Sequence, residues 1–241
     1  VPVRPNFFRA ATNNDVENKY GYRYGKWLTA SLYAKCEFVG VSKGDSSCKV
    51  EYAYDLPNLQ DEKVHLVYEV YGDGKIIVDM TYQPVSSEIE MPVFGLIFQL
   101  YKDMEEVNYY GFGPEENYID RNKGALLGKY AYQVTDNLTP YLYPQECGNI
   151  THVRELSVAG ENTNLTVKGE DFEFTALHYT PYELENARHK DELPNVYQTV
   201  LCINEKQMGV AGDDTWGAKT HDEFLLDKEK HHLRFSFKGK L

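Results

Sequence analysis

The sequence has few cysteines, and none of them lies in a pattern that holds a metal or forms a redox pair. Its 241 residues include four cysteines without a Cys-x-x-Cys, so zinc-site and thioredoxin-like interpretations lack support. We expect four free thiols, which favours a reducing compartment, the cytoplasm, over a periplasmic or secreted location. Three Asn-x-Ser/Thr triplets, at Asn137, Asn149 and Asn164, match the N-glycosylation pattern of secreted proteins and so favour the opposite location. Such triplets often arise by chance, so they carry little weight.

Long apolar runs and a basic surface are also missing. No stretch approaches the ~20 apolar residues that span a bilayer, so we expect no membrane segment. The formal net charge of −12 argues against a nucleic-acid partner, because binding phosphates requires a concentrated basic surface. The one dense basic patch, around Lys228, Lys230 and His231–His232, predicts a solvated strand edge or turn. The start Val1-Pro2-Val3, without methionine or leader, is typical of an excised fragment or a processed product.

Recognisable catalytic motifs are absent as well. There is no Gly-x-Ser-x-Gly, and Gly111-Phe112-Gly113-Pro114 lacks the helix and lysine of a phosphate-binding loop. The histidines form no His-x-His or His-Glu-x-x-His set, so no metal site is predicted in this chain. A retaining glycosidase needs two carboxyls ~5 Å apart, a distance that no sequence pattern reveals. The candidates for such an acid/base pair are the acidic residues beside glycine- or proline-rich loops, although the simpler interpretation is that they cap turns or lie on the solvated surface. These residues are Glu115, Glu116, Glu146, Glu155, Asp213 and Asp214.

Tyrosine is abundant, and it favours β-structure. There are 20 tyrosines, and aromatic residues make up 14% of the chain, which suits pleated, half-buried surfaces and also sugar binding. The clearest strands are residues 63–71 and 75–82, a hairpin around Gly72-Asp73-Gly74. Runs spaced by about ten residues indicate an antiparallel sandwich. The further runs are Cys48–Tyr54, Val93–Tyr101, Val153–Val158, Phe172–His178, Val196–Ile203 and His232–Phe237.

One or two short helices are predicted within this all-β domain. Thr180-Pro181-Tyr182-Glu183 is a capping box with proline at the first helical position, and its helix should end near His189. A weaker helix is expected over residues 25–32. No linker or repeat divides the chain, so residues 1–241 are predicted to form one domain. The stretch 108–148 has few clear strands, and we expect it to be functional or packed against a partner.

Two stretches are unusual enough to suggest a site. Residues 110–121 combine glycines, a proline and alternating charges, which predicts a loop that is tightly bent or able to move. Residues 207–217 place Trp216 beside Gly217 and after two aspartates. A tryptophan on such a loop can present its ring face to a sugar, or the indole can fill the end of the sandwich.

Four motifs along the chain carry a family resemblance. Arg9-Ala10-Ala11-Thr12-Asn13-Asn14-Asp15 resembles Arg-Ala-Pro-Thr-Asp-Asn-Asp, and residues 111–121 resemble Gly-x-Gly-Pro-x-Glu-Asn-Tyr-x-Asp-Arg. Residues 141–156 resemble Tyr-x-x-Pro-Gln-Glu-x-Gly-Asn followed by Arg-x-Leu, and residues 209–216 resemble Gly-x-Gly-Gly-Asp-Asp-Ser-Trp. In this order they resemble the C-terminal domain of the β-galactosidases of glycoside hydrolase family two.

The chain departs from these motifs at four positions. Ala11 replaces a proline, Asn13 an aspartate, Ala211 a glycine and Thr215 a serine. Alanine disfavours positive φ, so we expect the loop before Trp216 to differ in detail from the family's.

The resemblance implies a fold and a division of labour. The fold would be a large antiparallel super-sandwich, akin to that of galactose mutarotase. Trp216 would line a galactoside site, and a loop that can swing would border it. The catalytic glutamates, Mg²⁺ and Na⁺ would belong to a TIM-barrel portion or large subunit, leaving this chain without cofactor or catalytic residue. The loop residues carried over are Gly113, Pro114, Glu115, Glu116, Asn117, Tyr118, Asp120 and Arg121.

The resemblance also leads to expectations about behaviour. The isolated chain should be inactive, its amides from Glu115 to Tyr118 should exchange fast, and Glu116 and Asn117 should hold one loop state by hydrogen bonds. Two alternatives stay open. One is a stand-alone mutarotase-like epimerase using a histidine and a carboxylate, and the other is a carbohydrate-binding module.

Overall fold

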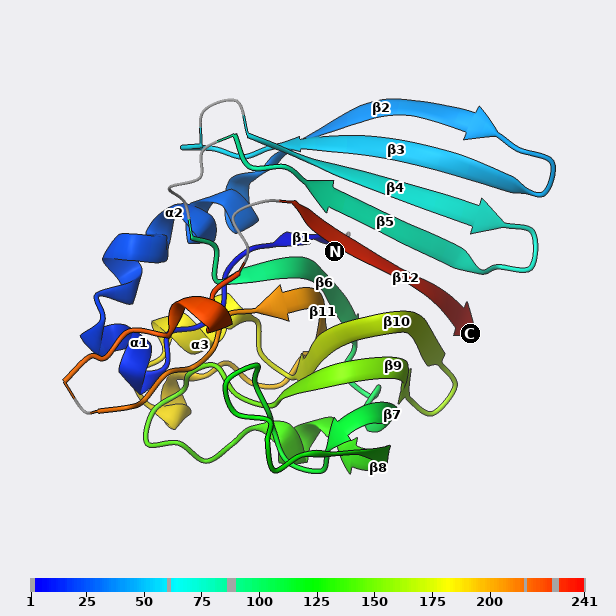
Figure 1. Cartoon of the computed structure of the whole chain (residues 1–241). Helices are drawn as coiled ribbons and strands as arrows, with labels where there is room; N and C mark the ends of the chain where they lie inside the picture. Colours follow the sequence, from blue (N-terminus) through cyan, green and yellow to red (C-terminus); the bar gives the residue numbers. More distant parts are fainter. Residues whose placement is uncertain (1–2, 60–61, 86–89, 215, 227–229, 241) are drawn as a thin grey trace.

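In the part of the chain that the structure describes, twelve antiparallel strands form one curled sheet (Figure 1), against which the hydrophobic core packs. The computed structural model describes residues 3–59, 62–85, 90–214, 216–226 and 230–240, so the predictions at Val1-Pro2, Thr215 and Lys228 lie outside it. The antiparallel all-β class is confirmed. The strands are β1 (Arg4–Asn6), β2 (Lys35–Lys43), β3 (Ser47–Asp55), β4 (Lys63–Tyr71), β5 (Ile76–Tyr82), β6 (Val93–Tyr101), β7 (Glu106–Gly113), β8 (Leu126–Gln133), β9 (Asn149–Ala159), β10 (Asn164–Leu177), β11 (Gln198–Gln207) and β12 (His231–Lys240).

The long strand β10 is where the sheet branches. The main order is β1-β6-β11-β10-β12-β5-β4-β3-β2, while β9 pairs with β10 and β7, and β7 pairs with β8. The first half of β10 (residues 164–169) pairs with β12, and its second half (173–177) pairs with β11. The predicted hairpin is β4–β5, with its turn at Gly72-Asp73-Gly74. Strands β2 to β5 extend outward as a four-stranded ribbon, which Figure 1 shows at the top.

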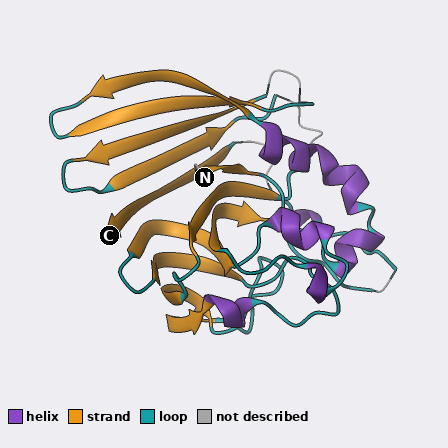
Figure 2. Cartoon of the chain, turned by 180° about the vertical axis from the view of Figure 1, so that it is seen from behind, coloured by secondary structure: helices purple, strands orange, loops and turns teal. Residues whose placement is uncertain are grey.

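Among the described residues, the three α-helices lie to one side of the sheet (Figure 2). They are α1 (Asn13–Glu17), α2 (Tyr20–Tyr33) and α3 (Pro181–Asn186). The capping box of α3 is confirmed, because Thr180 and Glu183 bond reciprocally, but the helix ends three residues before His189. The weaker predicted helix is part of α2, which is longer, and α1 was not predicted although Thr12 and Asp15 form a second capping box.

The expectation of few strands between residues 108 and 148 is wrong, because β7 and β8 lie there. In β7 the inward positions alternate as a strand requires, but two of them are Gly111 and Gly113. A Cβ at Gly111 would collide with Val153 on β9, and one at Gly113 would collide with Tyr109 and Tyr130. Close backbone approach therefore requires glycine where the strand pattern would show a large apolar residue.

Most of the core is one large cluster built from both ends of the chain and the middle, and two smaller clusters lie apart from it. Trp27 on α2 is fully buried beside Phe7, with ring centroids 5.8 Å apart, and its indole N–H donates to the Glu90 carbonyl at 2.6 Å. His231 also joins this region, stacked on Tyr82, so the prediction of a solvated edge is wrong for this histidine. None of the helices described here is long and apolar enough to cross a membrane, and all four cysteines are free thiols.

Candidate functional site

A buried arginine joins the first motif to the fourth. The Arg9 guanidinium is inaccessible to solvent and pairs with Asp15 at 3.0 Å. It also donates to the carbonyls of Met208 and Gly209, the latter at 2.9 Å, at the start of the loop that leads to Trp216. A charge this deeply buried is tolerated only with such partners. Arg9 therefore anchors the tryptophan loop on the N-terminal segment, about 200 residues away in sequence.

The second and third motifs meet through Glu116. Its carboxylate accepts from the Tyr141 hydroxyl and the Gly148 amide, both at 2.6 Å, and forms an ion pair with Arg121 at 2.6 Å. The third motif in turn contacts the first, because the side chains of Gln145 and Asn13 are bonded at 2.9 Å. All four motifs thus converge on one region.

Asp120 joins the second motif to the fourth. Its carboxylate accepts from the Ala211 amide at 2.8 Å, and a Cβ at Gly209 would collide with it. Ala211 takes a positive φ of 54° despite having a side chain. Alanine disfavours this conformation, and the bond to Asp120 helps to hold it in place. The expected difference in detail from the family's loop stays a prediction.

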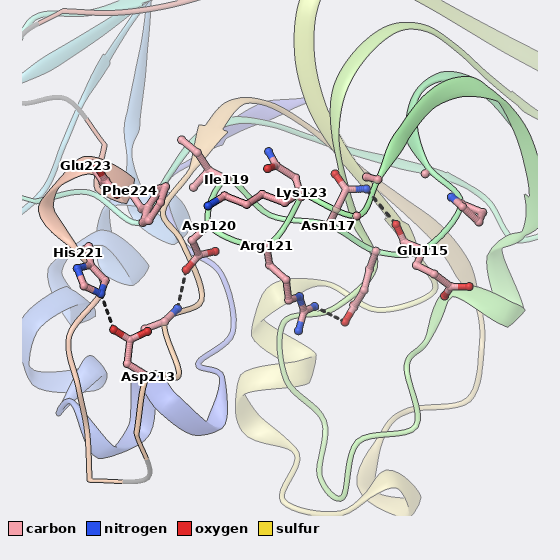
Figure 3. A pocket seen from close by; sticks show the side chains of 17 residues that line it. Glu115, Asn117, Ile119, Asp120, Arg121, Lys123, Asp213, His221, Glu223 and Phe224 are labelled. Atoms are coloured by element: carbon pink, nitrogen blue, oxygen red, sulfur yellow. Dashed lines mark hydrogen bonds and ion pairs between the residues drawn. The ribbon is translucent and has the colours of Figure 1, made fainter.

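A pocket of about 730 Å³ opens between these two loops (Figure 3). Figure 3 shows residues from 115 to 123 on one side and Asp213, His221, Glu223 and Phe224 on the other. His221 contacts Asp213 at 2.5 Å, and this hydrogen bond raises the pKa of the imidazole. The walls carry both signs of charge and donors and acceptors suited to hydroxyl groups. Of the predicted loop residues, those lining the pocket are Gly113, Pro114, Glu115, Glu116, Asn117, Asp120 and Arg121.

Tyr118 does not line the pocket but lies beneath it, almost fully buried. The Arg121 guanidinium lies 5.1 Å from its ring centroid, a cation–π contact that fixes the loop from above. Burial raises the pKa of the Tyr118 phenol well above its usual value. Its role here is to support the loop.

Asn117, like Glu116, makes the hydrogen bonds expected of it, and that they hold one loop state stays a prediction. Its amide nitrogen donates to the Phe112 and Glu115 carbonyls, and its side-chain oxygen accepts from the Thr151 amide at 2.9 Å. Its own backbone N–H donates to the Asn149 carbonyl at 2.7 Å. The backbone N–H of Tyr118 also donates, to the Arg121 carbonyl at 3.3 Å. These bonds oppose the expected fast amide exchange at residues 117 and 118, whereas Glu115 is exposed.

Trp216 lies on the loop between the pocket-lining residues Asp213 and His221, but it is not itself among the residues that line the pocket. Its side chain is 89% exposed, whereas that of Trp27 is fully buried, so the indole does not fill the end of the sandwich. Asp214 accepts from the backbone N–H groups of Trp216 and Ala218 at 2.8 and 3.1 Å, and this turn presents the ring to solvent.

Two buried glutamates beneath the site were not foreseen as such. Burial raises the pKa of Glu146 to about 7, against the opposing charge of Arg9, and the Gln207 side chain donates to it at 3.3 Å. Burial raises the pKa of Glu173 to about 8, although it accepts from Asn149. The sequence marked Glu146 as one of the acidic candidates beside glycine- or proline-rich loops and as part of the third motif, and nothing marked Glu173. Glu155, in contrast, is on the surface, paired with Lys168.

The described residues contain no cluster of three or more histidine, cysteine or acidic side chains arranged for a metal ion.

Comparison with known proteins identifies the family. The family described as "Beta galactosidase small chain" matches residues 1–238. A β-galactosidase of Streptococcus thermophilus is 40% identical over 95% of this chain and 23% of its own length. A β-galactosidase small subunit of Latilactobacillus sakei is 31% identical over 96% of this chain and 83% of its own length. The chain thus spans about a quarter of the first of these relatives.

Solved structures with a related arrangement include a GalM/aldose epimerase homologue from C. elegans. It is 11% identical, with a TM-score of 0.46, and the match covers 89% of this chain and 71% of that one. This likeness carries no argument about activity, whereas the family match extends over all four motifs. The chain belongs to the β-galactosidase small-chain family.

Proposed function

We propose that this chain is the non-catalytic part of a family-two β-galactosidase and forms one wall of its galactoside site. The observation that carries the proposal is the convergence of four distant motifs on one region, where the second and the fourth line a pocket and the exposed Trp216 lies on the loop of the fourth. Such a ring can pack on the apolar face of a sugar, and the loop from Gly113 to Asn122 would border the bound galactoside. Hydrolysis with retention would proceed through a glycosyl-enzyme intermediate on glutamates outside this chain.

The proposal includes a partner and a place. The catalytic TIM-barrel portion, on the same polypeptide or as a large subunit, would supply the nucleophile, the general acid and any Mg²⁺ or Na⁺. No membrane or nucleic acid takes part. The free thiols favour the cytoplasm as the compartment.

A chimaera tests the role of Trp216. In it, this chain replaces the matched segment of the S. thermophilus relative, and nitrophenyl-galactoside kinetics are measured. Trp216→Ala should raise KM about tenfold with a smaller change in kcat, because stacking is chiefly binding energy. Tyr101→Ala, which removes another exposed aromatic ring, should leave KM within twofold. Equal KM values for both variants would refute the role of Trp216.

The epimerase alternative has one observation in its favour, the His221–Asp213 pair in the pocket. Polarimetry of fresh α-galactose with the isolated chain separates the two functions. We expect no acceleration of mutarotation. Acceleration that His221→Asn abolishes would establish the epimerase instead.

A further inference from the structure

The ribbon β2–β5 carries an apolar face that nothing in the described structure covers at its outer end. Strand β2 has no buried residue, although Phe38 and Val41 are among its nine residues. Exposed apolar side chains that occur singly are ordinary, but a contiguous group of them marks an interaction surface.

The sheet register shows that Phe38 extends the core face. Residues directly opposite one another in an antiparallel sheet share a face. The row that runs outward across β12, β5, β4, β3 and β2 is Leu233, Met80, Leu66, Tyr52 and Phe38. Its first three members are buried, Tyr52 is half-buried, and Phe38 is 59% exposed.

A neighbouring row repeats this gradient. It comprises Phe235, Val78, Tyr68, Val50 and Val41 in the same strand order. The first two are buried, the next two are half-buried, and Val41 is 54% exposed. The rings of Phe38, Tyr52 and Tyr68 contact edge to face at 5.9 and 6.2 Å. The part of the chain that packs over the core face of the sheet therefore ends between β4 and β2. The apolar side chains on this face continue as far as the edge strand β2. We call Phe38, Val41, Val50, Tyr52 and Tyr68 the ribbon face.

A second copy of the chain is a poor occupant. If the β2 strands of two copies paired antiparallel about Val39, Lys35 of each copy would lie opposite Lys43 of the other. Like charges in directly opposite positions repel. The bulge between Phe38 and Gly40 interrupts the straight ladder that such pairing needs. The net charge of −12 on each copy adds a general repulsion.

We propose that the ribbon face is where the larger remaining part of the β-galactosidase packs. The inference rests on the proposed function. Its support is that the S. thermophilus relative carries this segment as 23% of its length, so about three quarters of that protein is further chain available as cover. An apolar, aromatic surface of this kind fits a permanent interface, which is more hydrophobic than a transient one.

Hydrogen exchange tests the proposal without any substitution. Amide exchange across β2 and β3 is compared between the isolated chain and the S. thermophilus chimaera. We expect exchange at least tenfold slower in the chimaera. Equal exchange in both proteins would overturn the docking face.

A pair of substitutions gives a second test. Phe38→Asp with Val41→Asp should shorten the half-life of chimaera activity at elevated temperature about tenfold and should abolish the added protection. In the isolated chain the same pair should leave the denaturant midpoint unchanged, because both side chains are exposed. Val85→Asp, at a valine that is 71% exposed outside the ribbon face, is the control and should change the half-life less than twofold.

The outcomes separate this proposal from the previous one. A double variant that behaves like the control would overturn the ribbon face as a docking site. Concentration-dependent dimers of the isolated chain that the double substitution dissociates would assign the face to a second copy, which also overturns it. An inactive chimaera with protected β2 and β3 amides would refute the proposed function but support the docking face.

Discussion

Folded chains usually expose polar groups and bury apolar ones, and two regions of this chain do the opposite. One is the site built from the four motifs, and the other is the ribbon β2–β5. At the site, polar and charged groups such as Arg9, Asp15 and Asn117 are buried, and each is held by several bonds. On the ribbon, large apolar groups such as Phe38 and Val41 face solvent. Buried polar groups need partners at defined positions, whereas exposed apolar groups need only something to cover them. Arg9, Asp15 and Asn117 find their partners within the chain, whereas Phe38 and Val41 stay uncovered in the described structure.

The largest effect should come from breaking the buried network. Arg9→Met removes the countercharge of Asp15 and the donors to Met208 and Gly209, and should cost about 3–5 kcal/mol of unfolding free energy. Arg234→Met, which breaks an exposed ion pair with Asp79, should cost less than about 1 kcal/mol. Urea denaturation of both variants measures the difference. Similar losses would show that burial does not distinguish the two arginines.

The buried glutamates predict a pH dependence of stability. Since burial raises the pKa of Glu146 to about 7 and that of Glu173 to about 8, the folded chain binds more protons than the unfolded chain above the ordinary carboxyl pKa. Stability from these groups is therefore full near pH 4 and is lost as pH rises to about 8. The urea midpoint should fall from pH 5.5 to 8.

Glu173→Gln keeps the shape of the side chain but cannot ionise, so it should flatten this slope. The surface variant Glu155→Gln should leave it unchanged, because Glu155 lies in an exposed pair. A slope that survives Glu173→Gln intact would remove Glu173 as its cause.

Loosening the loop should have an intermediate effect. Asn117→Ala leaves the Thr151 amide without its acceptor and should cost about 1–3 kcal/mol, with faster amide exchange at residues 115–118. Asn108→Ala, which removes an exposed bond to Glu106, is the matched control and should change neither quantity. Unaltered exchange in Asn117→Ala would mean that Glu116 and Arg121 hold the loop by themselves.

The smallest effect is expected at Trp216. Trp216→Ala in the isolated chain should change the unfolding free energy by less than about 0.5 kcal/mol, as exposed positions usually do. Trp27→Ala should cost about 3–5 kcal/mol, because it empties a packed core position. Denaturant midpoints of the two variants compare the same side chain in both settings. A large loss at Trp216 would contradict its exposed placement.

Features with a local cause were predictable from the sequence. The β4–β5 hairpin depends on two β-branched runs and a glycine turn within twenty residues, and the α3 cap depends on a spacing of three. The same local rule applies to Thr12 and Asp15, so the α1 cap was within reach. The four motifs and their order could also be recognised along the chain.

Features that depend on contacts between distant segments could not be predicted from the sequence and were decided by the tertiary structure. Strand β7 escaped notice because packing against β9 and β8 demands glycine at two inward positions, which erases the apolar alternation. The pKa values of Glu146 and Glu173 come from desolvation by segments far away in sequence. The bonds that join Arg9, Glu116 and Asp120 to distant segments likewise depend on which segments the fold brings together. The exposure of Phe38 depends on where the cover of the sheet ends. Sequence determined the local conformations and the residues available for chemistry, whereas burial, which sets their energies, was decided by the fold.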